Sequence, residues 1–353
     1  MRQDKKEGSF SKRRVLLIGG AGYIGSVLTG DLLEKGYRVR CLDLFLYQNK
    51  RAIAAYENHP DFDWQGGDFT DESMLEPALR GITDVVVLAG LVGDPITRKY
   101  PVESQKINED GILKLFEALH GRKLSRVVFV STCSNYGLIE DGKIADENYE
   151  LKPLSAYAKA KVFAEKKLLS LRGHVDYAAT ILRFATAFGL SPRMRFDLTV
   201  NEFMRELYFG KCLQVYDAHT WRPYCHVRDF SRLIGGVLEA PLEKISFEVF
   251  NAGGDANNFT KEMIVNEIRE SIKTGTVEYK EKGSDPRNYK VDFRKVSERL
   301  AFTPEWTVRD GIQELLRAFQ NRQFEDIESQ RNFYGNYHLE YEIAKEMSSS
   351  WEK

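Results

Sequence analysis

The sequence predicts an α/β fold, in which a doubly wound parallel sheet is joined by a smaller α+β lobe. Two observations predict this fold class. Short runs of Val, Ile and Leu recur from residue 15 onwards, and such runs are typical of parallel strands that are buried on both faces. Longer stretches with helical periodicity lie between these runs, and this alternation favours right-handed βαβ units.

The strands and helices of the sheet follow in chain order. Apolar runs predict strands at Val15–Ile18, Arg38–Leu42, Phe62–Trp64, Val85–Ala89, Val127–Val130 and Ala179–Leu182, and a late strand at Ser246–Asn251. Helical periodicity between the runs predicts helices at Gly25–Glu34, Gln105–Leu119 and Ala156–Leu171.

The pattern changes after about residue 190. Helices are expected at Leu198–Phe209 and Lys261–Ile272, short strands at Leu213–Tyr216 and Val277–Tyr279, and a helix that returns to the large domain at Val227–Leu238. We therefore expect a disordered arm at residues 1–12, a large domain at 13–190 with returning segments near 225–255, a lobe made of 191–224 and 256–320, and a C-terminal tail or peripheral helix at 321–353.

The composition excludes several classes of function. The chain has 353 residues, with 51 Lys and Arg against 52 Asp and Glu, a balance that excludes a generally polybasic nucleic-acid binder. The four cysteines form no C-x-x-C pair and no H-E-x-x-H motif occurs, so we expect neither a disulfide framework nor a metal site. The apolar runs are too short for a signal-peptide core or a membrane span. We expect a cytoplasmic protein without nucleic-acid or membrane partners.

A glycine-rich loop follows the first strand. The segment Gly19-Gly20-Ala21-Gly22-Tyr23-Ile24-Gly25 has the pattern G-x-x-G-x-x-G and opens the first helix. Glycines in this place allow a tight turn and the close approach of a pyrophosphate, which the amide groups at the helix N-terminus then hold. The loop predicts a Rossmann-type dinucleotide site that includes Gly19, Gly22, Tyr23, Ile24 and Gly25.

Two aspartates follow the second and third strands. Asp43 stands 18 residues beyond Gly25, where a carboxylate can accept hydrogen bonds from both ribose hydroxyls of NAD and repel a 2′-phosphate. The sequence therefore favours NAD over NADP as cofactor. Asp68 could accept from the adenine amino group. Either aspartate could instead be an ordinary strand-end or loop residue.

A candidate acid–base pair lies on a predicted helix. Tyr157 and Lys161 are four residues apart and share a helix face, where the ammonium group would favour the phenolate form of the tyrosine. Such a tyrosine can exchange a proton with a sugar hydroxyl or carbonyl. A second Y-x-x-x-K pair, Tyr341 and Lys345, has no strand or glycine loop around it and is interpreted as a chance match.

Together these features resemble the extended short-chain dehydrogenases/reductases of the nucleotide-sugar epimerase/dehydratase family. The matching segments run in family order over roughly residues 14–320: Gly19–Gly25, Asp43, Leu88-Ala89-Gly90, Asn108, Ser131–Gly137, Tyr157/Lys161, Leu182-Arg183-Phe184 and Trp221–Val227. The resemblance implies NAD as cofactor, a nucleotide sugar as substrate and a homodimer formed through the helices at Gln105–Leu119 and Ala156–Leu171.

The resemblance also implies roles for individual residues. Thr132 would hydrogen-bond the reacting sugar oxygen beside Tyr157, and Lys161 would also hold the nicotinamide ribose. Leu88, Ala89, Gly90 and Asn108 match cofactor-binding positions. Arg222 matches the arginine that grips the substrate pyrophosphate, with a surface ion pair as the alternative, and Arg287 is a candidate second phosphate contact. The basic segment around Arg193 and Arg195 supplies further candidate substrate contacts.

Departures from the family pattern bear on the reaction. Family 4,6-dehydratases place an Asp-Glu pair directly after the matching threonine, whereas this chain has Cys133 and Ser134 there. Both remain candidate substrate contacts, although Cys133 is also a candidate for an inert buried thiol. Many family members place an asparagine after the pair that matches Arg183-Phe184, whereas this chain continues with Ala185-Thr186-Ala187. We therefore expect an epimerase that oxidises and re-reduces a sugar carbon, with C4 the favoured position. A dehydrogenase or 4-ketoreductase is the alternative; a 4,6-dehydratase and a non-catalytic dinucleotide sensor are less favoured.

Overall fold

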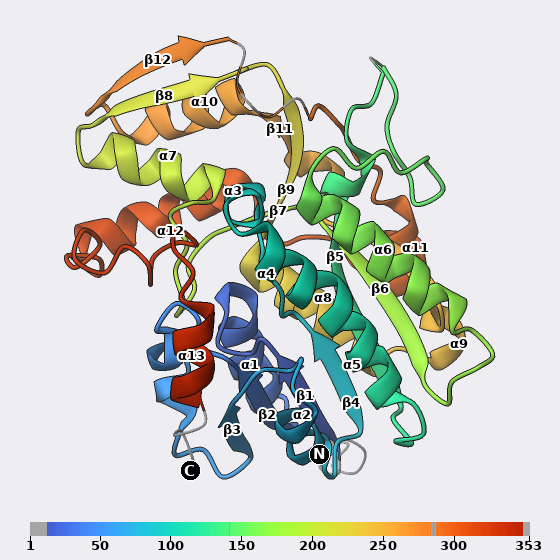
Figure 1. The fold of residues 1–353 in the computed structure, drawn as a ribbon. Helices are drawn as coiled ribbons and strands as arrows, with labels where there is room; N and C mark the ends of the chain where they lie inside the picture. Colours follow the sequence, from blue (N-terminus) through green and yellow to red (C-terminus); the bar gives the residue numbers. More distant parts are fainter. Residues whose placement is uncertain (1–12, 141, 282, 284, 286, 349–353) are drawn as a thin grey trace, which may run out of the picture.

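The computed structural model describes residues 13–140, 142–281, 283, 285 and 287–348, so the predicted disordered arm at residues 1–12 lies outside the described part. Its large domain is built on a seven-stranded sheet in which every neighbouring pair is parallel (Figure 1). The strand order is β10-β6-β5-β4-β1-β2-β3. The strands are β1 (Arg14–Ile18), β2 (Arg38–Asp43), β3 (Phe62–Gly66), β4 (Asp84–Val87), β5 (Arg126–Thr132), β6 (Ala178–Phe184) and β10 (Glu248–Ala252).

Helices cover both faces of this sheet, as a doubly wound fold requires. One face packs against α1 (Tyr23–Glu34), the 3₁₀ segment η1 (Asn49–Tyr56), α8 (Val227–Glu239) and α11 (Arg294–Leu300). The other face packs against α2 (Glu72–Leu79), α5 (Ile112–Leu119) and α6 (Ala156–Ser170). The predicted fold class is confirmed, including the late strand that becomes β10 and the returning helix that becomes α8.

The chain departs from the predicted elements at two places in this domain. The fourth strand ends at Val87 rather than Ala89, because the N–H groups of Leu88 and Ala89 both turn back to donate to the carbonyl of Ile18. The predicted helix Gln105–Leu119 is divided into α4 (Pro101–Gln105), a π-helical turn η2 (Lys106–Gly111) and α5. A π turn widens the helix locally and often marks a functional site.

The apolar stripe on α5 faces the sheet. Its members Ile112, Leu115, Phe116 and Leu119 are all buried in the core on that side. The stripe therefore stabilises the large domain, and the predicted dimer through this helix stays a prediction.

The smaller lobe lies over the carboxyl ends of the strands (Figure 1). It contains α7 (Thr199–Tyr208), α10 (Lys261–Ser271) and α12 (Val308–Gln320), the strand pair β8 (Cys212–Tyr216) and β12 (Thr276–Lys280), and the three-stranded sheet β11-β9-β7 (Asn258–Thr260, Trp221–His226 and Thr186–Phe188). A separate apolar cluster, which includes Met204, Leu207, Ile264 and Leu315, holds the lobe together.

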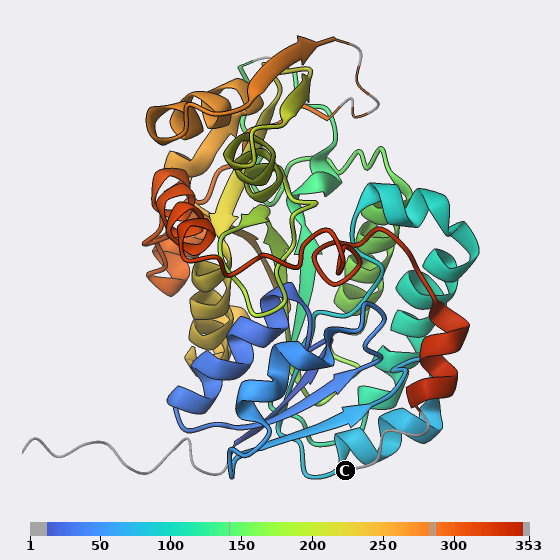
Figure 2. The same cartoon turned by 90° about the vertical axis from the view of Figure 1, so that its left-hand side faces the viewer.

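The remaining elements are short. They are α3 (Asp94–Lys99), η3 (Cys133–Tyr136), α9 (Leu242–Ile245), η4 (Asp255–Asn257) and the C-terminal helix α13 (Tyr341–Ser348). After α12 the chain crosses from the lobe to the large domain and ends in α13 beside it (Figure 2). Among the described residues, no helix combines the length and apolar character that crossing a membrane would need.

Candidate active site

A cavity of about 1020 Å³ lies between the carboxyl ends of the strands and the lobe. Ligands bind in this position in open α/β folds. Most of the predicted site residues line it: Gly19, Gly22, Tyr23, Ile24, Gly25, Asp43, Asp68, Leu88, Ala89, Gly90, Thr132, Ser134, Tyr157, Lys161, Arg193, Arg195 and Arg287. The fold thus brings together side chains that are far apart in the sequence.

The glycine loop forms one end of the cavity. Gly19 has φ +88°, a conformation that favours glycine, and α1 begins within the glycine-rich segment, with Gly22 as its N-cap. A Cβ atom on Gly25 would lie 2.4 Å from the carbonyl oxygen of Gly19 and 2.7 Å from the Cα of Gly20. The helix can therefore approach the loop this closely only with glycine at position 25.

We expect Gly25→Ala to weaken NAD binding about ten-fold or more, because the added methyl group must displace the loop backbone that faces the pyrophosphate. The measurement is a titration of NAD against each variant. Gly236→Ala is the matched control: Gly236 lies in α8 with open space around its Cα, so alanine should leave NAD binding unchanged and stabilise the helix by about 0.5–1 kcal/mol. Equal NAD affinity in both variants would contradict the assigned role of the loop.

Asp43 stands at the end of β2, beside this loop. Its Oδ2 accepts from the N–H of Ala21 at 3.0 Å and its Oδ1 from the N–H of Phe45 at 2.8 Å, so the carboxylate is fixed in place. Burial raises the pKa of Asp43, while these two N–H groups counteract the rise. A fixed carboxylate beside a glycine loop, in a cavity of this size, fits the adenosine half of NAD.

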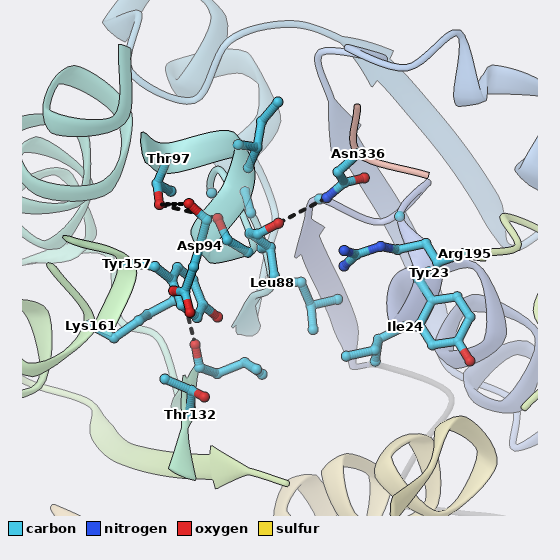
Figure 3. A pocket seen from close by; sticks show the side chains of 18 of the residues that line it. Tyr23, Ile24, Leu88, Asp94, Thr97, Thr132, Tyr157, Lys161, Arg195 and Asn336 are labelled. Carbon is cyan, nitrogen blue, oxygen red and sulfur yellow. Dashed lines mark hydrogen bonds between the residues drawn. The ribbon is translucent and has the colours of Figure 1, made fainter. Parts of the chain in front are cut away.

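The candidate acid–base residues lie on the other side of the cavity (Figure 3). Thr132 ends β5, and its hydroxyl accepts from the N–H of Ser134 at 3.1 Å. Tyr157 and Lys161 project from α6, whose N-terminus is capped by the hydroxyl of Ser155. The Lys161 ammonium donates to the carbonyl of Val130 at 2.9 Å and lies 6.0 Å from the centre of the Tyr157 ring.

The structure does not show the predicted effect, in which the Lys161 ammonium lowers the pKa of Tyr157. Burial raises the pKa of Tyr157 and the charge of Asp94 raises it further, while Arg195 and Arg287 counteract the rise. Burial also lowers the pKa of Lys161 to about 8. The reason is geometric, because the ammonium is directed to a backbone carbonyl rather than to the phenol. Burial and Asp94 therefore favour the phenol form of Tyr157, which can donate a hydrogen bond.

Asp94 is a site residue that the sequence did not indicate. It follows the loop after β4 and lines the cavity beside Tyr157, as Figure 3 shows. Its Oδ2 pairs with the guanidinium of Arg287 at 2.8 Å, and its buried Oδ1 has no hydrogen-bond partner among the described residues. Only its position after a cavity-lining strand could have signalled it, since no motif contains it. The cavity therefore presents one carboxylate next to the candidate acid.

Arg287 connects several groups on this side. Its guanidinium pairs with Asp285 at 2.7 Å as well as with Asp94, and donates to the hydroxyl of Ser134 at 2.9 Å. These contacts occupy most of its donors. Arg287 is thus built into the wall of the cavity near Tyr157 rather than left free for a phosphate.

Three predicted site residues do not line the cavity. Asn108 is buried on the π turn and braces the loop after β4, since its side chain exchanges hydrogen bonds with both backbone groups of Leu91 at 2.8 and 3.0 Å. Cys133 is buried and its thiol donates to the carbonyl of Arg183, and burial raises the pKa of that thiol. Arg222 is buried and pairs with Asp285 at 3.1 Å, so it holds the turn that carries Arg287.

Arg193 and Arg195 line the cavity near its cofactor end. Arg193 is 2% exposed and lies 4.8 Å above the ring of Tyr47. Arg195 pairs with Asp197 at 2.6 Å, and its guanidinium is directed into the cavity in Figure 3. In the described part of the chain, no three His, Cys, Asp or Glu side chains are grouped to hold a metal ion.

Comparisons with known proteins agree with this geometry. The sequence profile of the NAD dependent epimerase/dehydratase family matches residues 15–253. The uncharacterized UDP-glucose epimerase YtcB of Bacillus subtilis is 27% identical over 310 residues, which cover 85% of this chain and 95% of the relative. The dTDP-glucose 4,6-dehydratase of Streptomyces griseus is also 27% identical, over 84% of this chain and 91% of the relative.

A solved structure supports the same assignment. The structure described as MoeE5 in complex with UDP-glucuronic acid and NAD has a TM-score of 0.76 and 25% identity, and the match covers 88% of this chain and 99% of MoeE5. The relatives differ in the reaction that they are named for, so the comparisons fix the family and leave the reaction open. This chain belongs to the NAD dependent epimerase/dehydratase family.

Proposed function

We propose that this protein is an NAD-dependent nucleotide-sugar epimerase that acts at C4 of the sugar. The observation that supports the proposal is the grouping of Thr132, Tyr157 and Lys161 in the same cavity as the glycine loop and Asp43. When bound, NAD accepts a hydride from the sugar carbon and returns it to the opposite face. The glycine loop and Asp43 would hold the cofactor, and Lys161 would hold its nicotinamide ribose.

The side chains supply binding and proton transfer. As the phenolate, Tyr157 would take the proton of the sugar hydroxyl while the carbon is oxidised, and as the resulting phenol it would return that proton when the carbon is reduced. A bound substrate that brings the phenol closer to the Lys161 ammonium would favour the phenolate. Thr132 lies at the end of β5 and orients the same oxygen by a hydrogen bond. Lys161 is buried and Tyr157 is half-buried, and the low polarity around them would strengthen both interactions.

Dehydration is less well supported than epimerisation. A 4,6-elimination needs an acid and a base beyond the tyrosine, and the positions after Thr132 hold Cys133, which is turned away to Arg183, and Ser134, which contacts Arg287. The carboxylate of Asp94 lies near Tyr157 and pairs with Arg287. That carboxylate would repel the acid group of a sugar uronate, so the proposal favours a neutral sugar.

The alternative is a one-way dehydrogenase or 4-ketoreductase on the same class of substrate. It uses the same three residues and differs in releasing its cofactor after each hydride transfer. A non-catalytic dinucleotide sensor would need no acid–base tyrosine, so the cavity favours it least.

The test is a product analysis by mass spectrometry. The protein is incubated in deuterated water with NAD and a panel of neutral and acidic UDP- and dTDP-sugars. An isomer of unchanged mass, formed from a neutral sugar, is the expected result. Loss of two hydrogens with release of NADH would establish a dehydrogenase instead, and loss of water would establish a dehydratase. Turnover confined to a uronate would contradict the proposed role of Asp94.

A homodimer formed through α5 and α6, and a cytoplasmic location, belong to the same proposal. Both rest on the family resemblance. Light scattering of the purified protein tests the first, and a mass of one chain would exclude the dimer.

A further inference from the structure

The C-terminal segment contacts both halves of the molecule across the cavity. We call residues 322–348, which follow α12, the strap. It leaves the lobe, passes between the lobe and the large domain, and ends in α13 (Figure 2). Three of its residues, Asn336, Tyr337 and Tyr341, line the cavity. The strap therefore forms part of the cavity wall, although the family pattern read from the sequence ended near residue 320.

The first set of anchors ties the strap to the lobe. The carbonyl of Tyr334 accepts from the N–H of Phe196 at 2.8 Å, and the N–H of Asn336 donates to Asp197 at 3.2 Å. The guanidinium of Arg193 donates to the side-chain oxygen of Asn336 at 2.8 Å and to the carbonyl of Gly335 at 3.2 Å. Arg193 is thus held by the strap at the cavity edge.

The second set ties the strap to the large domain. The side-chain amide of Asn336 donates to the carbonyl of Val92 at 3.1 Å. The Tyr100 hydroxyl lies 2.8 Å from the Nδ1 of His338. Tyr341 and Lys345, the second Y-x-x-x-K pair, both contact Asp68: the Tyr341 hydroxyl donates to its Oδ2 at 2.5 Å, and the Lys345 ammonium lies 3.7 Å from the same atom.

This last contact places the strap at the cofactor end of the cavity. Asp43 ends β2 and Asp68 follows the adjacent strand β3, and both aspartates line the cavity together with the glycine loop. Tyr341 and Lys345, interpreted from the sequence as a chance match, therefore contact Asp68, the carboxylate predicted to accept from the adenine amino group. Asn336 joins both sets of anchors, since it contacts the lobe and the loop after β4 at once.

We propose that the strap completes the NAD site and keeps the cofactor bound between turnovers, with Tyr341 and Asn336 as its closing residues. Anchors at both ends hold the strap over the cavity, so the cofactor leaves only after several hydrogen bonds, one of them to a charged carboxylate, have opened together. The inference goes beyond the proposed function and needs only that the protein binds NAD.

The test is the rate at which the full-length protein releases the reduced cofactor. NADH is loaded, its fluorescence is followed after mixing with excess NAD, and the dissociation rate is compared among variants. Tyr341→Phe removes only the hydroxyl at Asp68, and Asn336→Ala removes the link between the lobe and Val92. Each is expected to speed release about ten-fold or more. Tyr177→Phe is the matched control, because it removes a buried hydroxyl without a described partner at the amino end of β6, away from the cavity.

One outcome would overturn the inference: both strap variants release NADH at the same rate as the wild-type protein. Thermal unfolding of each variant shows that the fold is intact. The readout uses the cofactor alone, so failure of the nucleotide-sugar panel would leave this result standing, and success of the panel would not rescue it.

Discussion

Replacing Tyr157 with phenylalanine is expected to lower kcat by about 10²- to 10⁴-fold, the usual contribution of a positioned acid–base group. Phenylalanine keeps the ring that packs in the cavity and removes only the hydroxyl that exchanges the proton. Since Tyr157 lies on the side of the cavity away from the glycine loop, NAD binding should stay within about three-fold of the wild type. Steady-state kinetics on the sugar identified by the product panel, together with an NAD titration, measure both quantities.

The control for this substitution is Tyr177→Phe, which removes a buried hydroxyl remote from the cavity and should leave kcat unchanged. A Tyr157→Phe enzyme with kcat close to that of the wild type would remove the tyrosine from the mechanism. The same result would make Asp94 the next candidate for the acid–base group, because it is the carboxylate beside Tyr157.

Glu165→Gln is expected to lower the free energy of unfolding by about 3–5 kcal/mol, which is the usual effect of removing one partner of a buried ion pair. The Oε2 of Glu165 pairs with the Arg183 guanidinium at 2.8 Å, and both side chains are at most 5% exposed. The Glu165 carboxylate also accepts from Asn135 at 2.8 Å and from the hydroxyl of Ser131. The substitution leaves the buried guanidinium without its countercharge. Urea unfolding followed by circular dichroism measures the change.

A surface ion pair provides the comparison. Glu140 pairs with Lys143 on the exposed surface. We expect Glu140→Gln to cause no measurable change in the free energy of unfolding. Equal stability of the two variants would show that the Glu165 network contributes little. Since Ser131 and Thr132 are neighbours at the end of β5, a loss of this network should also displace the Thr132 hydroxyl, which lines the cavity.

The fold could be predicted because its signal is local. A parallel strand buried on both faces is largely apolar, so β1, β4 and β5 appear directly as runs rich in Val, Ile and Leu. The helix α2 left a weaker signal, since it is short and contains Pro77. The π turn η2 could not be predicted, because it depends on where Asn108 meets Leu91 in space.

The candidate site likewise contains residues that a local motif predicts and residues that only the fold brings together. The glycine loop and the pair Tyr157 and Lys161 are short motifs whose spacing follows from one turn or one helix face. Asp94 belongs to no motif and becomes a site residue only because the fold places it beside Tyr157. The contact between Tyr341 and Asp68 joins residues 273 positions apart, so no local pattern contains it.

The position of β10 has a consequence for folding during synthesis. This edge strand pairs with β6, yet the chain between them first builds β7, α7, β8, β9 and α8. The ribosome must therefore release part of the lobe before the sheet of the large domain can be finished, and α13 follows later still. Folding of this kind is slow and non-local, and the unpaired edge of β6 is exposed to chaperones or aggregation meanwhile. A nascent chain stalled before residue 248 should thus remain sensitive to protease.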